Sequence, residues 1–218
     1  MEKGRESRSL KERIQQWNAE HAADFPAEVQ AIFATKTEEI IQSGILSQCM
    51  REGDKAPDFA ITNHRGETVA LRQKLENGPA ILSFYRGTWC PYCNLEFREL
   101  LDHLPQFRSR DTVVLALSPQ VIDRNESPEQ QGFEDLSDRG NAVARTYGLV
   151  YPLGQEIRRI YESFGLRLEE LNEDESFELP LPATFVIDRD SSVRYAFISG
   201  EISERAEPEE LVQILADL

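Results

Sequence analysis

Apolar residues recur every three to four positions in two stretches near the start of the chain, with charged residues between them. This spacing predicts two amphipathic helices, over about residues 8–22 and 27–42, each of which must bury one face. Gly44 is a typical helix stop, and residues 52–57 form a polar linker with turn residues at both ends. The stripes consist of Leu10, Ile14 and Trp17 in the first stretch and Val29, Ile32, Phe33, Thr37 and Ile40 in the second.

From residue 57 onward, the pattern changes to short apolar and β-branched runs that alternate with series at helical spacing. The run over residues 80–85 is mostly apolar, as expected for a buried strand. Strands and helices that alternate in this order indicate an α/β fold with one sheet covered by helices. Further strands are expected over residues 58–62, 68–71, 112–117, 184–187 and 193–198, helices over 97–107, 142–147, 157–164 and 208–215, and an acidic loop over 169–175.

Composition and charge narrow the classes of partner. The chain has 218 residues, enough for one substantial core. It carries 24 Lys and Arg against 39 Asp and Glu, a net charge of −15, which repels nucleic acid and anionic membrane surfaces. No run approaches the roughly 18 apolar residues of a membrane helix, and the N-terminus lacks the apolar region of a secretory signal. We therefore expect a cytoplasmic protein that binds neither nucleic acid nor membranes.

The chain has three cysteines, and two of them lie three residues apart in Cys90-Pro91-Tyr92-Cys93. A buried strand is expected to end near Tyr85 and a helix to begin near Cys90. The first helical turn has backbone N–H groups without intrahelical partners, and the positive end of the helix dipole lies there. A thiolate at this place is stabilised, so its pKa falls below the free value of about 8.5. We expect Cys90 to be the nucleophile and Cys93, one turn deeper and less exposed, to be the resolving thiol.

A pair of cysteines at this spacing can also be half of a zinc site, which requires a second pair of ligands. The remaining candidates are Cys49 and three scattered histidines, His21, His64 and His103, none of them at ligand spacing. We therefore expect no metal, and packing explains His21 best. Cys49 is interpreted as a small buried apolar residue, with a role as a second resolving thiol as the alternative. The dithiol is interpreted as redox-active.

The stretch Trp89-Cys90-Pro91-Tyr92-Cys93 resembles the active site of thioredoxin. The wider frame resembles the peroxiredoxin family, in the alkyl-hydroperoxide-reductase and thiol-specific-antioxidant (AhpC/TSA) group. The resemblance covers about residues 51–215 and implies a thioredoxin fold: a central mixed β-sheet flanked by helices, with the site at the start of the first long helix. It divides the chain into an N-terminal helical extension, residues 1–50, and a thioredoxin-like domain, residues 51–218. The matching segments are residues 53–59, 84–87, 136–138, 143–144, 147–149 and 184–188.

The sequence departs from both families. Peroxiredoxins carry Thr-x-x-Cys followed by Glu three residues later; Cys93 and Glu96 fit the second half of this pattern, but Cys90 stands at the threonine position. Thr88 fits neither register. Pro182 stands where peroxiredoxins have an arginine, and it resembles the cis-proline that faces the dithiol in thioredoxins, so a cis peptide bond is expected there. Phe84 stands where thioredoxin has a buried aspartate, so that proton-transfer group is missing.

Three residues near the dithiol have two interpretations each. Arg86 is either a positive charge beside the thiolate or a solvated surface charge. Glu96 is either a carboxylate on the helix face or a catalytic group. Trp89 is interpreted as a packing lid beside the dithiol, with contact to the substrate as the alternative. A fourth residue, Thr88, is interpreted as a loop hydroxyl that caps the following helix.

The resemblance implies a thiol peroxidase that reduces hydrogen peroxide or organic hydroperoxides. Cys90, or Cys93 in the other register, becomes a sulfenic acid, and its neighbour condenses with it to a disulfide. Thioredoxin or a similar dithiol then restores the reduced pair by exchange, without a metal or an organic cofactor.

Two alternatives remain at this stage. The first is a thioredoxin-like dithiol–disulfide oxidoreductase acting on protein disulfides, with Pro182 docking the partner backbone; Cys90 and Pro182 favour it over peroxide chemistry. The second is a redox sensor or binding module whose N-terminal helices carry a partner interface. The sequence leaves the oligomeric state open, with a homodimer as one alternative.

Overall fold

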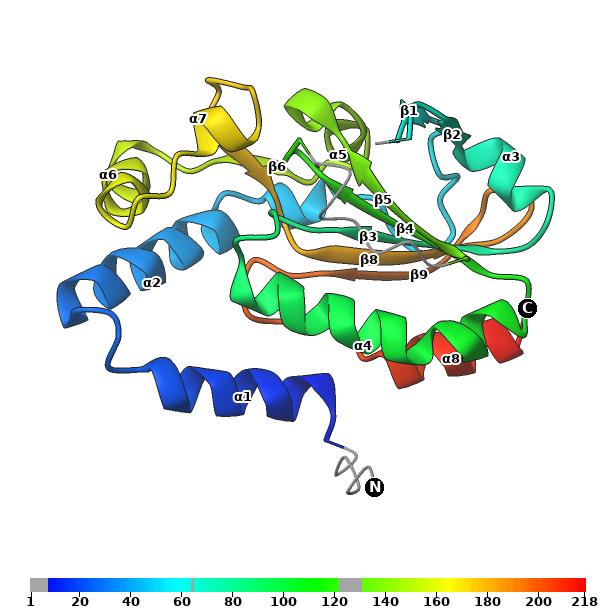
Figure 1. The fold of residues 1–218 in the computed structure, drawn as a ribbon, viewed down its shortest axis with the longest axis horizontal. Helices are drawn as coiled ribbons and strands as arrows, with labels where there is room; N and C mark the ends of the chain where they lie inside the picture. The colour runs from blue at the N-terminus through cyan, green and yellow to red at the C-terminus, as the bar shows by residue number, and fades with distance from the viewer. Residues whose placement is uncertain (1–7, 64, 122–130) are drawn as a thin grey trace.

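The computed structural model describes residues 8–63, 65–121 and 131–218 (Figure 1). Its central sheet has the strand order β5-β4-β3-β8-β9 within these ranges. β3 pairs in parallel with β4, and β4 with β5, whereas β8 runs antiparallel to both β3 and β9. The sheet is therefore mixed. Its strands are β3 (Ala80–Phe84), β4 (Val113–Ser118), β5 (Phe133–Ser137), β8 (Ala183–Ile187) and β9 (Val193–Ile198).

Helices cover both faces of this sheet, with α4 and α8 side by side on one face (Figure 1). Two small antiparallel pairs, β1–β2 and β6–β7, lie outside the central sheet. The helices are α1 (Leu10–His21), α2 (Ala27–Gln42), α3 (Leu71–Leu75), α4 (Pro91–Arg108), α5 (Ala142–Thr146), α6 (Gln155–Ser163), α7 (Leu168–Leu171) and α8 (Pro208–Ala216). The remaining strands are β1 (Ala60–Thr62), β2 (Thr68–Ala70), β6 (Val150–Pro152) and β7 (Glu178–Pro180), and short 3₁₀ turns span Ile45–Ser47 and Arg139–Asn141.

The central strand β3 is buried on both faces, which explains its nearly continuous apolar sequence. Ile81 belongs to the core beneath α4 and α8, together with Tyr85 just after the strand. Leu82 and Phe84 point to the opposite core, toward α3, α5 and α6. Successive side chains of a strand alternate between faces, so the same five residues anchor both layers.

The turn between β3 and α4 places the dithiol. Gly87 has φ +147°, and a Cβ at this position would lie 2.3 Å from Trp89 Nε1 and 2.7 Å from Gln120 Oε1. Only glycine fits this backbone, because the turn is both left-handed and tightly packed. The chain therefore leaves the sheet at Phe84 and enters α4 at Pro91, with Cys90 at the helix N-terminus.

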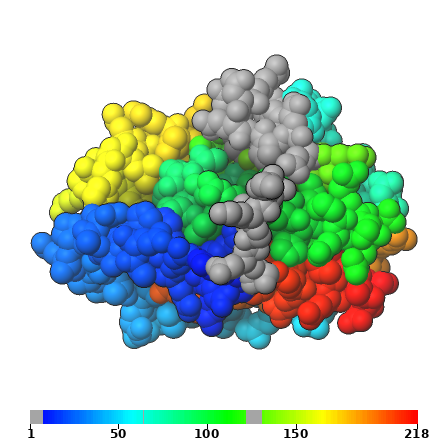
Figure 2. Space-filling view, turned by 60° about the horizontal axis from the view of Figure 1, so that its bottom comes forward, coloured from blue at the N-terminus to red at the C-terminus, as the bar shows by residue number. Residues whose placement is uncertain are grey.

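The first helix docks on α4 and on the start of α8. The Glu207 carboxylate accepts hydrogen bonds from the backbone N–H groups of Leu10, at 2.9 Å, and Lys11, at 2.8 Å. Arg13 forms an ion pair with Glu99 of α4 at 3.0 Å. In Figure 2 the N-terminal helices, in blue, spread over one side of the molecule, next to the yellow segment that contains α6 and α7. The N-terminal helices are therefore packed on the rest of the fold.

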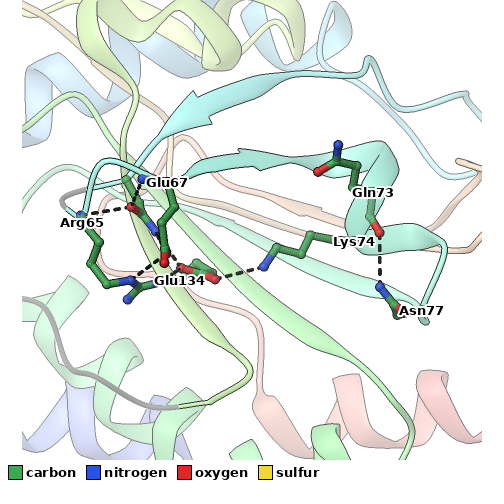
Figure 3. A network of polar contacts seen from close by, with 7 residues as sticks. Arg65, Glu67, Gln73, Lys74, Asn77 and Glu134 are labelled. Carbon is green, nitrogen blue, oxygen red and sulfur yellow. Dashed lines mark hydrogen bonds and ion pairs between the residues drawn. The ribbon is translucent and has the colours of Figure 1, made fainter.

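A polar network joins the β1–β2 hairpin and α3 to the edge strand β5 (Figure 3). The Glu134 carboxylate of β5 lies 2.8 Å from Arg65 Nη2 and 2.9 Å from Lys74 Nζ. Arg65 also pairs with Glu67 at 2.8 Å. At the end of α3, the Asn77 side-chain amide donates to the Gln73 carbonyl. The network stabilises the carboxylate, and the pKa of Glu134 is lowered by Lys74 and Arg65 against the raising effect of burial.

The α/β class, the mixed sheet and both N-terminal helices are confirmed, and Gly44 ends the second helix region with φ +79°. Five helices and strands were not predicted: β5, α3, β6, β7 and α7. The acidic loop expected over 169–175 is partly wrong, because its first residues belong to α7. No helix in the described ranges is both long and apolar enough to cross a bilayer.

We expect the Glu207→Ala variant to loosen α1. The substitution removes the carboxylate that binds two backbone N–H groups at the positive end of this helix. A loss of about 1–2 kcal/mol in local stability increases the population of the detached helix by about 5- to 30-fold. Trypsin cleavage after Lys11 and Arg13 measures this population. Asp217→Ala, at the exposed C-terminal end of α8, is the control; equal cleavage rates in both variants would contradict the assignment.

Candidate active site

Cys90 and Cys93 occupy the first turn of α4. Cys90 is the N-cap residue, Pro91 stands at the first helical position, and both thiols are reduced and free. Each cysteine is only 1% exposed. The expectation that Cys90 is the more exposed thiol is therefore wrong, because α1 and α2 lie over the N-terminus of α4. Cys90 instead lines a pocket of about 810 Å³ between these helices and the rest of the fold, and a small reactant can meet it there.

The two thiols have opposite pKa shifts. Burial raises the pKa of Cys90, but a hydrogen bond from the Cys93 thiol and the positive charges of Arg86 and Arg205 outweigh it, and the pKa falls to about 6. The pKa of Cys93 is raised well above the ordinary thiol value by burial and by the neighbouring Cys90. At neutral pH, Cys90 is a thiolate and Cys93 is a thiol. The two thiols of the motif therefore differ in charge.

Arg86 is buried beside the dithiol, so its interpretation as a solvated surface charge is wrong. Its guanidinium lies 4.9 Å above the Trp89 ring and donates a hydrogen bond to the Tyr161 hydroxyl. Within the described part of the chain, no carboxylate pairs with Arg86, and its Nε atom has no hydrogen-bond partner. The Cys90 thiolate is an anion on which this charge acts.

A second buried arginine, Arg205, contacts the other thiol. Its Nη2 atom donates to Cys93 Sγ at 3.3 Å, and its Nε atom donates to Glu96 at 2.6 Å. Glu96 also accepts hydrogen bonds from the hydroxyls of Ser83, at 3.1 Å, and Thr184, at 3.3 Å. Glu96 therefore lies on the buried face of α4, under the sheet. Burial raises its pKa, although Arg205 opposes the shift.

Sequence reasoning did not identify Arg205. It stands in the loop before α8, 112 residues from Cys93, without any motif around it. Phe84 packs in the opposite core against Tyr147 and Phe185, so the dithiol side of the sheet receives its buried carboxyl from Glu96 instead.

Thr88 supports the loop before the dithiol. Its backbone N–H donates to Gln120 Oε1 at 2.8 Å, and its hydroxyl accepts from Gln120 Nε2 at 3.0 Å. The expectation that Thr88 caps α4 is wrong, because no side chain caps this helix and Gln120 engages the threonine. Trp89 lines the pocket beside Cys90 with its ring edge toward Tyr161.

Pro182 does not have the expected cis peptide bond, since every peptide bond in the described ranges is trans. The reason is the extended path between β7 and β8. Leu181 N–H donates to the Leu149 carbonyl, and the Pro182 carbonyl accepts from Ser199 N–H, which leaves no tight turn at this position. Pro182 is buried but does not belong to the wall of the pocket at Cys90.

Cys49 is buried, as expected, in the core on the other face of the sheet from the dithiol. Its thiol donates to the carbonyls of Ile45 and Gly148, and burial raises its pKa to about 11. The sheet separates this thiol from Cys90 and Cys93. Cys49 therefore lacks the properties of a second resolving thiol.

Two of the three histidines make packing or surface contacts, and no group of three metal-ligating side chains occurs in the ranges that the structure describes. His21 stacks on Trp17 with 4.3 Å between ring centroids, which confirms its packing role. His103 lies 3.2 Å from Glu209. His64 lies outside the described residues.

The fold and the site together define a class of protein. A dithiol at the start of a helix that follows a central strand, with one thiol ionised and the other protonated, is the arrangement of a thiol-based oxidoreductase. The five-stranded mixed sheet that carries it is of the thioredoxin-fold class.

Comparison with known proteins identifies the family. The model of the AhpC/TSA family matches residues 52–196, and the chain belongs to this family. The thiol-disulfide oxidoreductase ResA of Bacillus anthracis is 25% identical over 159 residues, which cover 72% of this chain and 76% of ResA. Chloroplastic peroxiredoxin Q of Triticum aestivum is 23% identical over 180 residues, which cover 81% of this chain and 72% of peroxiredoxin Q.

Solved structures confirm the thioredoxin fold of the peroxiredoxins. Peroxidoxin BcpB of Mycobacterium tuberculosis has a TM-score of 0.56 and 22% identity, and the match covers 78% of this chain and 98% of that chain. A variant of PrxQ from Xylella fastidiosa has a TM-score of 0.58 and 16% identity, and the match covers 77% of this chain and 96% of that chain. At these identities the likeness establishes the fold alone.

We expect iodoacetamide to alkylate Cys90 in the reduced protein with a rate that rises with pH around a midpoint of about 6. The thiolate is the reactive form, so the rate is low below this pH and constant above it. Arg86→Met removes a stabilising charge and moves the midpoint upward, whereas Arg72→Met, at an exposed position, leaves it unchanged. Peptide mass spectrometry reports the label at Cys90. A midpoint at or above the free-thiol value of about 8.5 would contradict the assignment.

The Arg205→Met variant is expected to lose roughly 3–5 kcal/mol in free energy of unfolding, because it leaves the Glu96 carboxylate buried without its cation. Urea unfolding of the reduced protein measures the loss. Arg194→Met removes an exposed ion pair with Asp188 and is expected to cost at most about 1 kcal/mol. The double variant Arg205→Met with Glu96→Leu removes both charges and regains part of the stability; no regain would show that charge burial is not the cause.

Proposed function

We propose that the protein is a thiol-dependent peroxidase in which Cys90 is the peroxidatic cysteine and Cys93 the resolving cysteine. One observation carries the proposal: Cys90, at the N-terminus of α4, lines a pocket beside the buried guanidinium of Arg86, and Cys93 lies in the first turn of the same helix. The lowered pKa of Cys90 and the raised pKa of Cys93 agree with it. The opposite register, with attack by Cys93, has less support, because this thiol is protonated and is absent from the pocket wall.

In the first step the Cys90 thiolate attacks the terminal oxygen of a hydroperoxide. The S–O bond forms, the O–O bond breaks, and the leaving alkoxide takes up the proton that Cys90 released on ionisation. Negative charge develops on the leaving oxygen, and the buried guanidinium of Arg86 stabilises such charge. The Tyr161 hydroxyl accepts a hydrogen bond from Arg86 and keeps its own proton for donation, since burial raises its pKa.

In the second step Cys93 attacks the sulfur of the Cys90 sulfenic acid. A disulfide forms, the S–O bond breaks, and the departing hydroxide takes the thiol proton of Cys93 and leaves as water. Arg205 contacts Cys93 directly and favours its thiolate, while Glu96 holds Arg205 in place. Arg205 and Glu96 are therefore assigned as positioning residues for the resolving thiol.

Thioredoxin or a similar dithiol restores the reduced pair, with two electrons passing to the Cys90–Cys93 disulfide. The proposal assigns the enzyme to the cytoplasm, where such reductants are maintained, and requires no metal or organic cofactor. Thr88 and Pro182 receive supporting roles. Thr88 fixes the loop through Gln120, and Pro182 leads the chain into β8.

A dithiol–disulfide oxidoreductase is the second candidate, and a specific observation favours it. ResA, the relative of Bacillus anthracis described above, is named a thiol-disulfide oxidoreductase. A protein disulfide must bring its sulfur into the pocket beneath α1 and α2, and thioredoxin must do the same to reduce the Cys90–Cys93 disulfide. The burial of Cys90 therefore does not separate the two candidates, and the turnover assays below do.

Turnover of hydrogen peroxide and cumene hydroperoxide with a thioredoxin couple tests the proposal. We expect the wild-type protein to consume both and Cys90→Ser to lose at least about 100-fold of the rate, because the nucleophile is absent. Cys93→Ser is expected to consume one equivalent and stop at a sulfenic acid on Cys90, which dimedone traps. Peroxide consumption no faster than by free cysteine would refute the peroxidase, and reduction of insulin disulfides by the same preparation would then support the second candidate.

A further inference from the structure

The pocket at Cys90 is built largely by the N-terminal helices. Nine of its twenty lining residues belong to α1, α2 and the turn between them, a segment outside the part matched by the family model. Three aromatic pairs join this segment to the rest of the wall: Trp17 with Tyr92 (5.2 Å between ring centroids), Phe25 with Phe164 (5.6 Å) and Phe33 with Tyr161 (6.0 Å).

The volume of the pocket exceeds what hydrogen peroxide needs. A water molecule takes up about 30 Å³ in the liquid, so a molecule with two oxygens fills less than about a tenth of 810 Å³. Pockets of about 300–1,000 Å³ with aromatic walls are typical of sites for organic molecules. A small polar substrate would leave the aromatic side chains in contact with water. Their apolar surface would then contribute nothing to binding.

Two hydrogen-bonding side chains of the pocket wall lie beside Cys90. Arg86 is buried beside Cys90 and has a free Nε donor, and the Tyr161 hydroxyl beside it retains a proton to donate. Glu201 is the other fully charged residue of the wall, and it is half-buried in the loop after β9. An occupant that matches this wall has an apolar, aromatic-sized body and one oxygen-bearing end.

We propose that α1 and α2 are the specificity element of the enzyme and bind the apolar organic group of the substrate. The substrate class is a bulky hydroperoxide whose aryl-sized group contacts Trp17, Phe25 and Phe33 while its O–O bond lies at Cys90. This inference rests on the proposed function for the reacting bond, and its chemical step is the one given above. Contact with the aromatic wall buries apolar area of the substrate, which adds affinity. The same contact holds the O–O bond at Cys90, which favours the reaction.

Substrate competition tests the inference. Ala34 and Ala31 are both exposed alanines of α2, one turn apart; Ala34 belongs to the pocket wall and Ala31 does not. Ala34→Phe fills the pocket, so the ratio of kcat/KM for cumene hydroperoxide to that for hydrogen peroxide is expected to fall at least about tenfold. Ala31→Phe is the matched control and keeps the wild-type ratio. An unchanged ratio in Ala34→Phe, in a protein that remains an active peroxidase, would overturn the inference and leave the proposed function standing.

A binding experiment separates the pocket from the chemistry. Both tryptophans of the chain, Trp17 and Trp89, line the pocket, so intrinsic fluorescence reports its occupancy. We expect 2-phenyl-2-propanol, the alcohol product of cumene hydroperoxide, to give a saturable fluorescence change with full-length Cys90→Ser. The added substitution Ala34→Phe weakens this binding at least about tenfold, equivalent to about 1.4 kcal/mol, whereas Ala31→Phe does not.

The outcomes of the two experiments are distinguishable. Saturable binding that Ala34→Phe weakens, in a protein without peroxidase turnover, supports the apolar site and refutes the proposed function alone. Absence of saturable binding in Cys90→Ser, with circular dichroism showing a folded protein, overturns the inference whatever the turnover.

Discussion

Two buried arginines determine the state of the dithiol, and the chemistry of the site depends on them. A thiolate that is 1% exposed loses the water that would otherwise stabilise its charge. Arg86 and Arg205 replace that water on the side of Cys90, together with the hydrogen bond from Cys93. Cys93 remains protonated because the charge on its neighbour opposes a second ionisation. The two thiols of the motif thereby become chemically different.

The fold brings these charges together from distant parts of the chain. Arg86 follows β3 directly, whereas Arg205 precedes α8. Ser83 and Thr184 face each other across the pairing of β3 and β8, and both donate to Glu96, which in turn binds Arg205. Cys93 is therefore connected through Arg205 and Glu96 to the paired strands β3 and β8, and its geometry does not depend on loops alone.

The sequence predicts the local part of the site and misses the part made by tertiary contacts. A strand followed by a dithiol and a helix is determined by neighbouring residues, and this junction was predicted correctly. The burial of Arg86 depends on packing against Tyr161, and the role of Arg205 depends on a contact over 112 residues, so neither has a local signal. The strand β5 was missed for a related reason: its charged residues break the apolar pattern, and contacts such as the pairing of Glu134 with Lys74 stabilise them.

The departures from the peroxiredoxin pattern have a common consequence in the proposed mechanism. With Cys90 at the position of the threonine, the reactive sulfur moves one helical turn toward the N-terminus of α4, where unpaired backbone N–H groups favour a thiolate. With Pro182 at the position of the arginine, the positive charge at the reacting bond comes from Arg86 instead. In this register the reactive sulfur lines the pocket under α1 and α2. The shift of one turn therefore makes the N-terminal helices part of the active site, since they form the wall that a substrate of Cys90 must contact.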